Sequence, residues 1–72
     1  MSIGIGNVVR ESEQNPDWQM YPGQTGVVLR RADEEMELPG CGRFWMVRFV
    51  EESGAFEDSI FLDTDLEVVR GS

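Results

Sequence analysis

The longest apolar run in the chain, residues 43–50, reads Arg-Phe-Trp-Met-Val-Arg-Phe-Val and constrains the fold more than any other segment. Side chains of a β-strand point alternately to opposite faces, so the run divides into two sets. The uncharged set comprises Trp45, Val47 and Phe49. The other set is apolar apart from one arginine and comprises Phe44, Met46, Arg48 and Val50.

A strand at the surface of an antiparallel sheet normally has one polar face. Both faces of residues 43–50 are apolar, so we predict a central strand whose second face is covered by a loop or contacts another chain. A helix is disfavoured here because the run has no N-terminal cap and is rich in β-branched and aromatic residues.

Four more strands are predicted from short apolar segments bounded by glycine, proline and acidic residues. They lie within residues 3–11, 23–31, 55–62 and 66–70. Gly6 and Asn7 form a turn-like entry to the first, and Gly26 enters the second after a turn at Pro22 and Gly23. A hairpin turn is predicted at 51–54, and 63–65 suits a single 3-10 turn before the last strand. Outside the central strand, the predicted core residues are Val9, Val28, Phe56, Ile60, Phe61 or Leu62, Leu66, and Val68 or Val69.

The first loop, residues 11–23, is polar and contains two prolines, yet it carries Trp18, Met20 and Tyr21. These large side chains either fold back over the sheet, including the second face of the central strand, or form a protein-binding surface. Trp and Tyr are enriched at the energetic centres of protein interfaces. The sequence leaves both alternatives open.

The second loop, residues 32–42, contains four acids, Asp33, Glu34, Glu35 and Glu37. Their spacing does not match a calcium-binding EF-hand loop. We predict a solvated, mobile loop with at most one helical turn over 32–37. Cys41 has no histidine to activate it, which argues against a catalytic thiolate.

The length of 72 residues predicts one domain over residues 1–70, and 71–72 are interpreted as an appended tail. A domain this small buries only about 60% of its unfolded surface, so an additional source of stability is expected. A single cysteine cannot form an internal disulfide, and the lack of histidine argues against zinc. Self-association remains, and we expect no metal and no cofactor.

The net charge is −8, from fourteen acids and six arginines, with no lysine. Such a balance argues against nucleic acid and anionic membranes, which attract positive surfaces. A basic partner would be attracted. Neither a signal peptide nor an apolar span is apparent, and the single cysteine suits a reducing compartment, so we expect a cytoplasmic location.

Four short motifs resemble those of Src-homology-3-like (SH3-like) barrels. They are Gly6-x-x-Val9-Arg10, Gly23-x-x-Gly26-x-Val28, Val47-x-Phe49, and Phe61-Leu62-x-x-x-Leu66-x-x-Val69. The pattern is similar to KOW-type barrels, the photosystem I subunit IV family and the variable chain of ferredoxin–thioredoxin reductase. The resemblance implies a five-stranded all-β barrel that binds other macromolecules or itself.

We therefore expect a non-catalytic module that binds another protein or assembles with itself. The candidate interaction surface comprises Trp18, Met20, Tyr21, Phe44, Met46 and Val50. One alternative is an enzyme or small-ligand binder with a site between subunits, using Glu57 and Asp58, or Asp63 and Asp65, as acids and bases. Another is nucleic-acid binding through Arg30, Arg31, Arg43 and Arg48, which the overall charge disfavours.

Overall fold

The computed structural model describes residues 3–12 and 19–71, which form one antiparallel sheet. This confirms the predicted all-β class. Its strands are β1 (Val8–Glu11), β2 (Gly26–Arg31), β3 (Phe44–Val50), β4 (Phe56–Leu62) and β5 (Leu66–Arg70). The 3-10 turn η2 (Asp63–Asp65) connects β4 to β5, as predicted.

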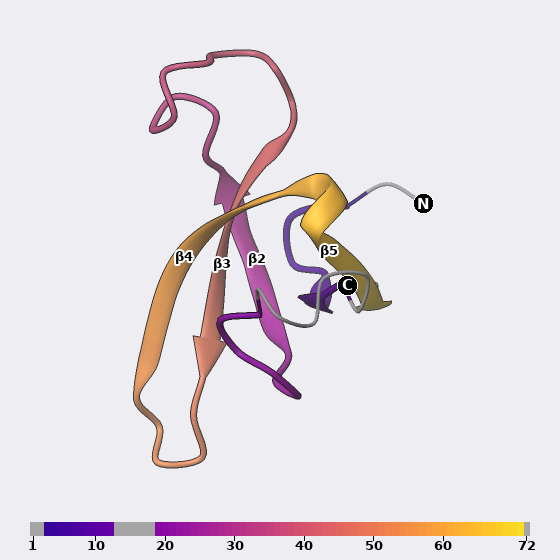
Figure 1. The fold of residues 1–72 in the computed structure, drawn as a ribbon, viewed down its shortest axis with the longest axis vertical. Helices are drawn as coiled ribbons and strands as arrows, with labels where there is room; N and C mark the ends of the chain where they lie inside the picture. Colours follow the sequence, from indigo (N-terminus) through magenta and orange to yellow (C-terminus); the bar gives the residue numbers. More distant parts are fainter. Residues whose placement is uncertain (1–2, 13–18, 72) are drawn as a thin grey trace.

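The strand order is β4-β3-β2-β1-β5, so β3 is an interior strand between β4 and β2, and β4 and β5 are the edge strands. Figure 1 shows β2, β3 and β4 as three long neighbouring strands, with β1 and β5 to one side. The chain runs up and down through the first four strands and then returns through η2 to place β5 beside β1. This return brings both ends of the chain to the same sheet.

The core lies on one face of the sheet and receives side chains from all five strands. The run in β3 alternates in burial, as its sequence predicts, with its uncharged set facing inward. Packing of these residues supplies most of the stabilisation available to so small a chain. The buried cluster consists of Val9, Val28, Trp45, Val47, Phe49, Phe61 and Leu66.

Turns are present at Pro22-Gly23 and between β3 and β4, where the sequence predicts them. Tyr21 accepts a hydrogen bond from the Gln24 N–H at 3.1 Å, and Gly23 between them has φ of 76°. A positive φ at that position is typical of a type II turn and is accessible to glycine. The β3–β4 hairpin closes where the Glu51 N–H donates to the Ala55 carbonyl at 2.8 Å.

The second strand begins at Gly26, after the turn at Pro22 and Gly23, as predicted. Three other details of the prediction are wrong. The first strand begins at Val8, because the Gly4 N–H bonds to the Asn7 side chain at 2.7 Å and residues 3–7 form a turn instead. Ile60 is not a core residue: it is only half-buried and lies beside Met46, on the side of the sheet away from the core. Phe56 is not a core residue: it is 59% exposed, because it lies at an even position of β4, on the face away from the core.

Candidate interaction surface

The face of β2, β3 and β4 that points away from the core is largely apolar, and we name it the outer face. The strand register places its residues in rows: Phe44 beside Leu62, Met46 beside Ile60, Arg48 beside Asp58, and Val50 beside Phe56. From β2, Val27 adjoins Arg48 and Arg30 adjoins Met46. Its most exposed apolar members are Phe56, Val50 and Val27, at 59%, 53% and 40%.

An ion pair lies among these apolar residues. Arg48 donates two hydrogen bonds to Asp58, from Nε to Oδ1 at 2.8 Å and from Nη2 to Oδ2 at 3.0 Å. The hydrogen bonds from Arg48 lower the pKa of Asp58, and the same carboxylate raises the pKa of Arg48. Both groups therefore stay charged, and each neutralises the other.

The aromatic ring of Phe56 contacts the same arginine. The guanidinium carbon of Arg48 lies 4.1 Å from the ring centroid, which is cation–π geometry. Arg48 is thus held on one side by Asp58 and on the other by Phe56. This arrangement keeps an exposed phenylalanine at a fixed position on the outer face.

Tyr21, one of the predicted first-loop residues that the structure describes, does not join the outer face. Trp18 lies outside the described residues. The ring of Tyr21 stacks on Phe49 at 4.3 Å between centroids, and its hydroxyl bonds to Ser59 Oγ at 2.9 Å. Phe49 and Ser59 belong to the core side of the sheet, so Tyr21 covers the core and not the outer face.

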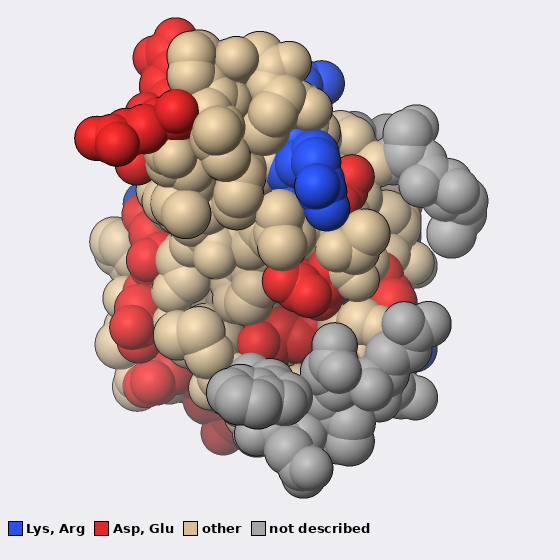
Figure 2. Space-filling model, turned by 45° about the horizontal axis from the view of Figure 1, so that its top comes forward, with Lys and Arg blue, Asp and Glu red and all other residues tan. Residues whose placement is uncertain are grey.

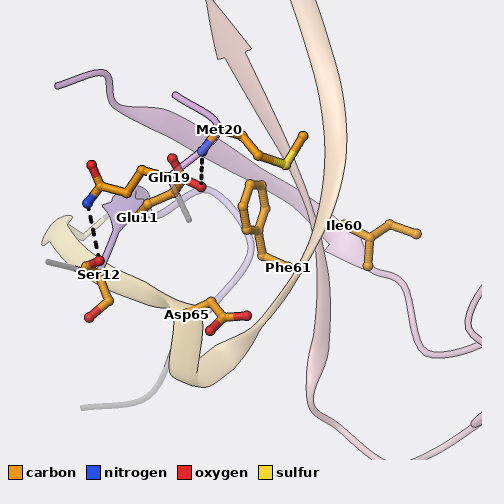
Figure 3. Close-up of a pocket in the computed structure, with 7 residues that line it drawn as sticks. All are labelled: Glu11, Ser12, Gln19, Met20, Ile60, Phe61 and Asp65. Carbon is orange, nitrogen blue, oxygen red and sulfur yellow. Dashed lines mark hydrogen bonds between the residues drawn. The ribbon is translucent and has the colours of Figure 1, made fainter. Parts of the chain in front are cut away.

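Met20 is 60% exposed and lines a pocket of about 230 Å³ between the first loop and β4. Figure 3 shows its thioether beside Phe61, and shows Ile60 pointing away from the other lining residues. Glu11 holds the loop here, accepting hydrogen bonds from the main-chain N–H groups of Met20 at 2.9 Å and Tyr21 at 2.7 Å. Met20 thus lines a pocket to which the predicted residues of β3 do not contribute.

Most of the second loop is exposed, as predicted, and turns replace a regular helix there, but a buried acid anchors the loop to the start of β3. Asp33 is buried and accepts hydrogen bonds from the N–H groups of Phe44 and Gly42, both at 2.9 Å, and from Cys41 Sγ at 3.3 Å. The bond from Phe44 is the main cause of a lowered pKa at Asp33. This role could not be predicted from the composition of the loop, because the residue type alone does not indicate whether an aspartate is buried or exposed.

Arginines and acids are paired over much of the described chain. These pairs confirm the interpretation of Arg30 and Arg31 as ion-pair partners of neighbouring acids. They consist of Arg10 with Glu67, Arg30 with Glu35, Arg31 with Asp33 and Arg48 with Asp58. Figure 2 shows acidic side chains along one margin and across the middle of the molecule, with few basic ones between them.

A second pocket, of about 620 Å³, lies between the start of β3 and η2–β5. Trp45 and Asp63 line it, and two of their buried polar atoms, Trp45 Nε1 and Asp63 Oδ1, have no hydrogen-bond partner among the residues that the structure describes. The guanidinium of Arg31 lies 5.0 Å from the Trp45 ring centroid. The pocket thus combines an indole donor, a carboxylate acceptor and a cation.

Within the described residues, no cluster of three potential metal-ligating side chains occurs, and no helix is long and apolar enough to cross a bilayer. The first pair of acids considered for catalysis, Glu57 and Asp58, lies on opposite faces of β4. Asp58 is paired with Arg48, whereas Glu57 is exposed on the other face. A general acid needs a raised pKa, and that of Asp58 is lowered.

No family model, curated protein or solved structure matches the chain.

Proposed function

We propose that this chain is a non-catalytic protein-binding module whose docking surface is the outer face. The observation that carries the proposal is the exposure of Val27, Val50 and Phe56 around the Arg48–Asp58 pair. Aromatic residues and arginine are enriched at the centres of interfaces, where they are surrounded by apolar contacts. No described segment of the first loop covers this face, because Tyr21 packs on the core side.

The partner we propose is a basic protein with an apolar patch. The charges within the outer face are already matched, since Arg48 is paired with Asp58 and Arg30 with Glu35. Burying the face therefore leaves no unpaired charge at its centre, which would be costly. The remaining surface carries the net charge of −8, which accelerates association with a positively charged protein.

The experiment compares two valines of similar exposure on different surfaces. Val50 is 53% exposed on the outer face, and Val69 is 51% exposed on β5. A partner captured by the wild-type chain is purified, and its affinity for Val50→Glu and Val69→Glu is measured by calorimetry. We expect Val50→Glu to weaken binding by about tenfold or more, as for a residue at an interface centre, and Val69→Glu to bind like wild type. Equal affinities of the two variants would contradict the proposal.

We also propose that the sheet curls into an SH3-like barrel. The support is the strand order, the core that draws on all five strands, and the 3-10 turn between β4 and β5. A cytoplasmic location belongs to the same proposal, and the exposed free thiol of Cys41 supports a reducing compartment.

A second candidate function, small-ligand binding, is favoured by the pocket beside Trp45. An amide group offers an acceptor to Trp45 Nε1 and a donor to Asp63 Oδ1, the two atoms without partners. The test is a fragment screen that follows the indole N–H signal of Trp45 by NMR, with Trp18→Phe identifying that signal. Displacement of the signal by amide fragments, reduced in Asp63→Ala, is expected if the pocket binds them. An unchanged signal throughout the screen would contradict this function.

A further inference from the structure

The edge strand β4 has main-chain groups that point out of the sheet, and the ladder with β3 shows which ones. The Asp63 N–H donates to the Arg43 carbonyl at 2.7 Å, and the Glu51 N–H donates to the Ala55 carbonyl at 2.8 Å. Hydrogen-bonded and non-hydrogen-bonded pairs alternate in an antiparallel ladder, so the odd-numbered residues of β4 bond to β3. The groups that point outward belong to Phe56, Asp58, Ile60 and Leu62.

This outward edge is accessible. Among the described residues, β4 pairs with β3 alone, and Figure 1 shows it along the left margin of the molecule. Ile60 lines the pocket of about 230 Å³, yet its side chain points away in Figure 3, so its main chain borders the pocket. Long exposed edge strands are templates for pairing with another strand.

We propose that β4 pairs antiparallel with β4 of a second copy of this chain, about a two-fold axis at Ser59. Outward-pointing residues must face one another, so Asp58 lies opposite Ile60 of the second copy, and Phe56 lies opposite Leu62 of the second copy. All residues of Phe56–Leu62 then take part. The strand addition joins two five-stranded sheets into one continuous sheet.

Charge and length select this register over its neighbours. Registers that keep outward groups facing one another differ by steps of two residues. One neighbouring register places Asp58 opposite Asp58 of the second copy, and like charges opposite each other are destabilising. The other leaves Phe56 without a partner in the strand. Centring on Ser59 instead places Glu57 opposite Phe61 and pairs no acid with an acid.

The total charge gives the dimer a defined salt dependence. Each copy carries −8, and Arg48 neutralises Asp58 at the contact itself. Long-range repulsion is screened by salt, while the main-chain hydrogen bonds are short-ranged. Added salt should therefore strengthen the dimer, whereas a dimer held by intermolecular ion pairs would weaken.

The first test is the mass of the wild-type chain over a concentration series, combined with amide hydrogen exchange. We expect a dimer at high concentration, with the amides of Asp58, Ile60 and Leu62 becoming protected as it forms. The amides of Glu57 and Ser59 should be protected at every concentration by β3. A monomer throughout the series, or an oligomer in which the outward amides stay unprotected, would overturn the proposal.

The second test is specific for the register. Each dimer contains two contacts between residue 60 of one copy and Asp58 of the other. Ile60→Lys places a cation opposite Asp58 in both contacts, and Ile60→Glu places an acid there. Relative to Ile60→Ala, we expect the dissociation constant to fall about tenfold for lysine and to rise about tenfold for glutamate. If both charges weaken the dimer equally, as a register centred on Ile60 requires, the proposed pairing is wrong.

The dimer uses the edge of the sheet, whereas the proposed function uses its outer face, and the experiments separate them. Val50→Glu should leave the dissociation constant of the dimer unchanged while weakening the binding of the basic partner. Ile60→Pro removes an outward N–H that β3 does not use, so it should abolish the dimer where Ile60→Ala does not. If the proline variant does not fold, the Ile60→Lys and Ile60→Glu comparison decides the question. A chain that pairs only with a foreign strand would remain monomeric alone, and that outcome also overturns the proposal.

Discussion

Arg48 and Asp58 occupy directly opposed positions on β3 and β4 and are joined by two hydrogen bonds, at 2.8 and 3.0 Å. Their side chains are about two-fifths and one-third exposed, so water reaches the pair. The pair matters less as a source of stability than as a means of keeping charge neutral on an apolar face. Phe56, which contacts Arg48 on its other side, depends on the same arrangement.

Replacing Asp58 should destabilise the chain more than replacing its neighbour Glu57. In Asp58→Ala, Arg48 loses both hydrogen bonds and remains as an unpaired cation among apolar residues, whereas Glu57→Ala removes an exposed acid. We expect a modest loss in the free energy of unfolding for Asp58→Ala, as exposed pairs usually contribute little. Urea titrations at low and high salt measure it.

The difference between the two variants should shrink in high salt, because ionic screening weakens an exposed pair. Arg48→Ala provides the matched control, since the double variant should cost less than the sum of the two single ones. Additive losses would show that Arg48 and Asp58 do not interact in solution.

Asp33 should make stability depend on acid pH. Its pKa is lowered from 3.8 in the folded state, chiefly by the Phe44 N–H, so on acidification the unfolded chain takes up the proton first. The stabilisation is therefore complete above the unfolded pKa of 3.8 and is lost as the pH falls through the lower folded pKa. The lowered pKa of Asp58 acts in the same direction.

The measurement is the free energy of unfolding from pH 7 to pH 2 for wild type, Asp33→Asn and Glu34→Gln. The asparagine amide would place a donor against the N–H groups of Phe44 or Gly42, so Asp33→Asn should be less stable at pH 7 and lose stability less steeply in acid. Glu34 is exposed, and its substitution makes the same change in charge. Identical pH profiles for all three proteins would exclude Asp33 as the titrating anchor.

The strands could be predicted from the sequence because their information is local. The alternation at Trp45, Val47 and Phe49 identifies both the strand and its buried face, and the glycines and acids between runs mark the turns. Phe56 was predicted as buried because it is large and apolar, but burial depends on which face its strand position occupies.

Much of the candidate site depends on contacts between distant residues, which no local pattern specifies. Asp33 anchors Phe44 across eleven positions, and Tyr21 reaches Ser59 across thirty-eight. The predicted turn over 51–54 would set Val50 opposite Ala55 and therefore Arg48 opposite Glu57. In the structure Glu51 bonds to Ala55, and this shift by one residue is what sets Arg48 opposite Asp58. Alternation identifies the outer-face residues of β3, whereas the sequence alone leaves two alternatives for the position of Tyr21.

Removal of the Tyr21 hydroxyl should cost about 1 kcal/mol, the usual net contribution of one hydrogen bond. The hydroxyl bonds to Ser59 Oγ at 2.9 Å, while the ring keeps its stacking on Phe49 in Tyr21→Phe. Thermal or urea unfolding measures the loss. Ser59→Ala should cost about the same, and the double variant about as much as either single one. Fully additive losses would contradict the hydrogen bond.

Gly26 should be the least replaceable glycine in the described sheet. A Cβ at this position would lie 2.8 Å from Val47 Cγ1 and 2.9 Å from the Arg48 carbonyl oxygen. The main-chain oxygen cannot move without breaking the β2–β3 ladder, so the methyl group of Gly26→Ala must separate the two strands. Overpacking of this kind costs about 1–3 kcal/mol.

Gly71→Ala is the control, because no described atom lies within 4 Å of its added Cβ. Denaturant unfolding should show a large loss for the first variant and no change for the second, and the amides of β2 and β3 should exchange faster in Gly26→Ala. A Gly26→Ala protein as stable as wild type would mean that β2 does not pack this closely against β3.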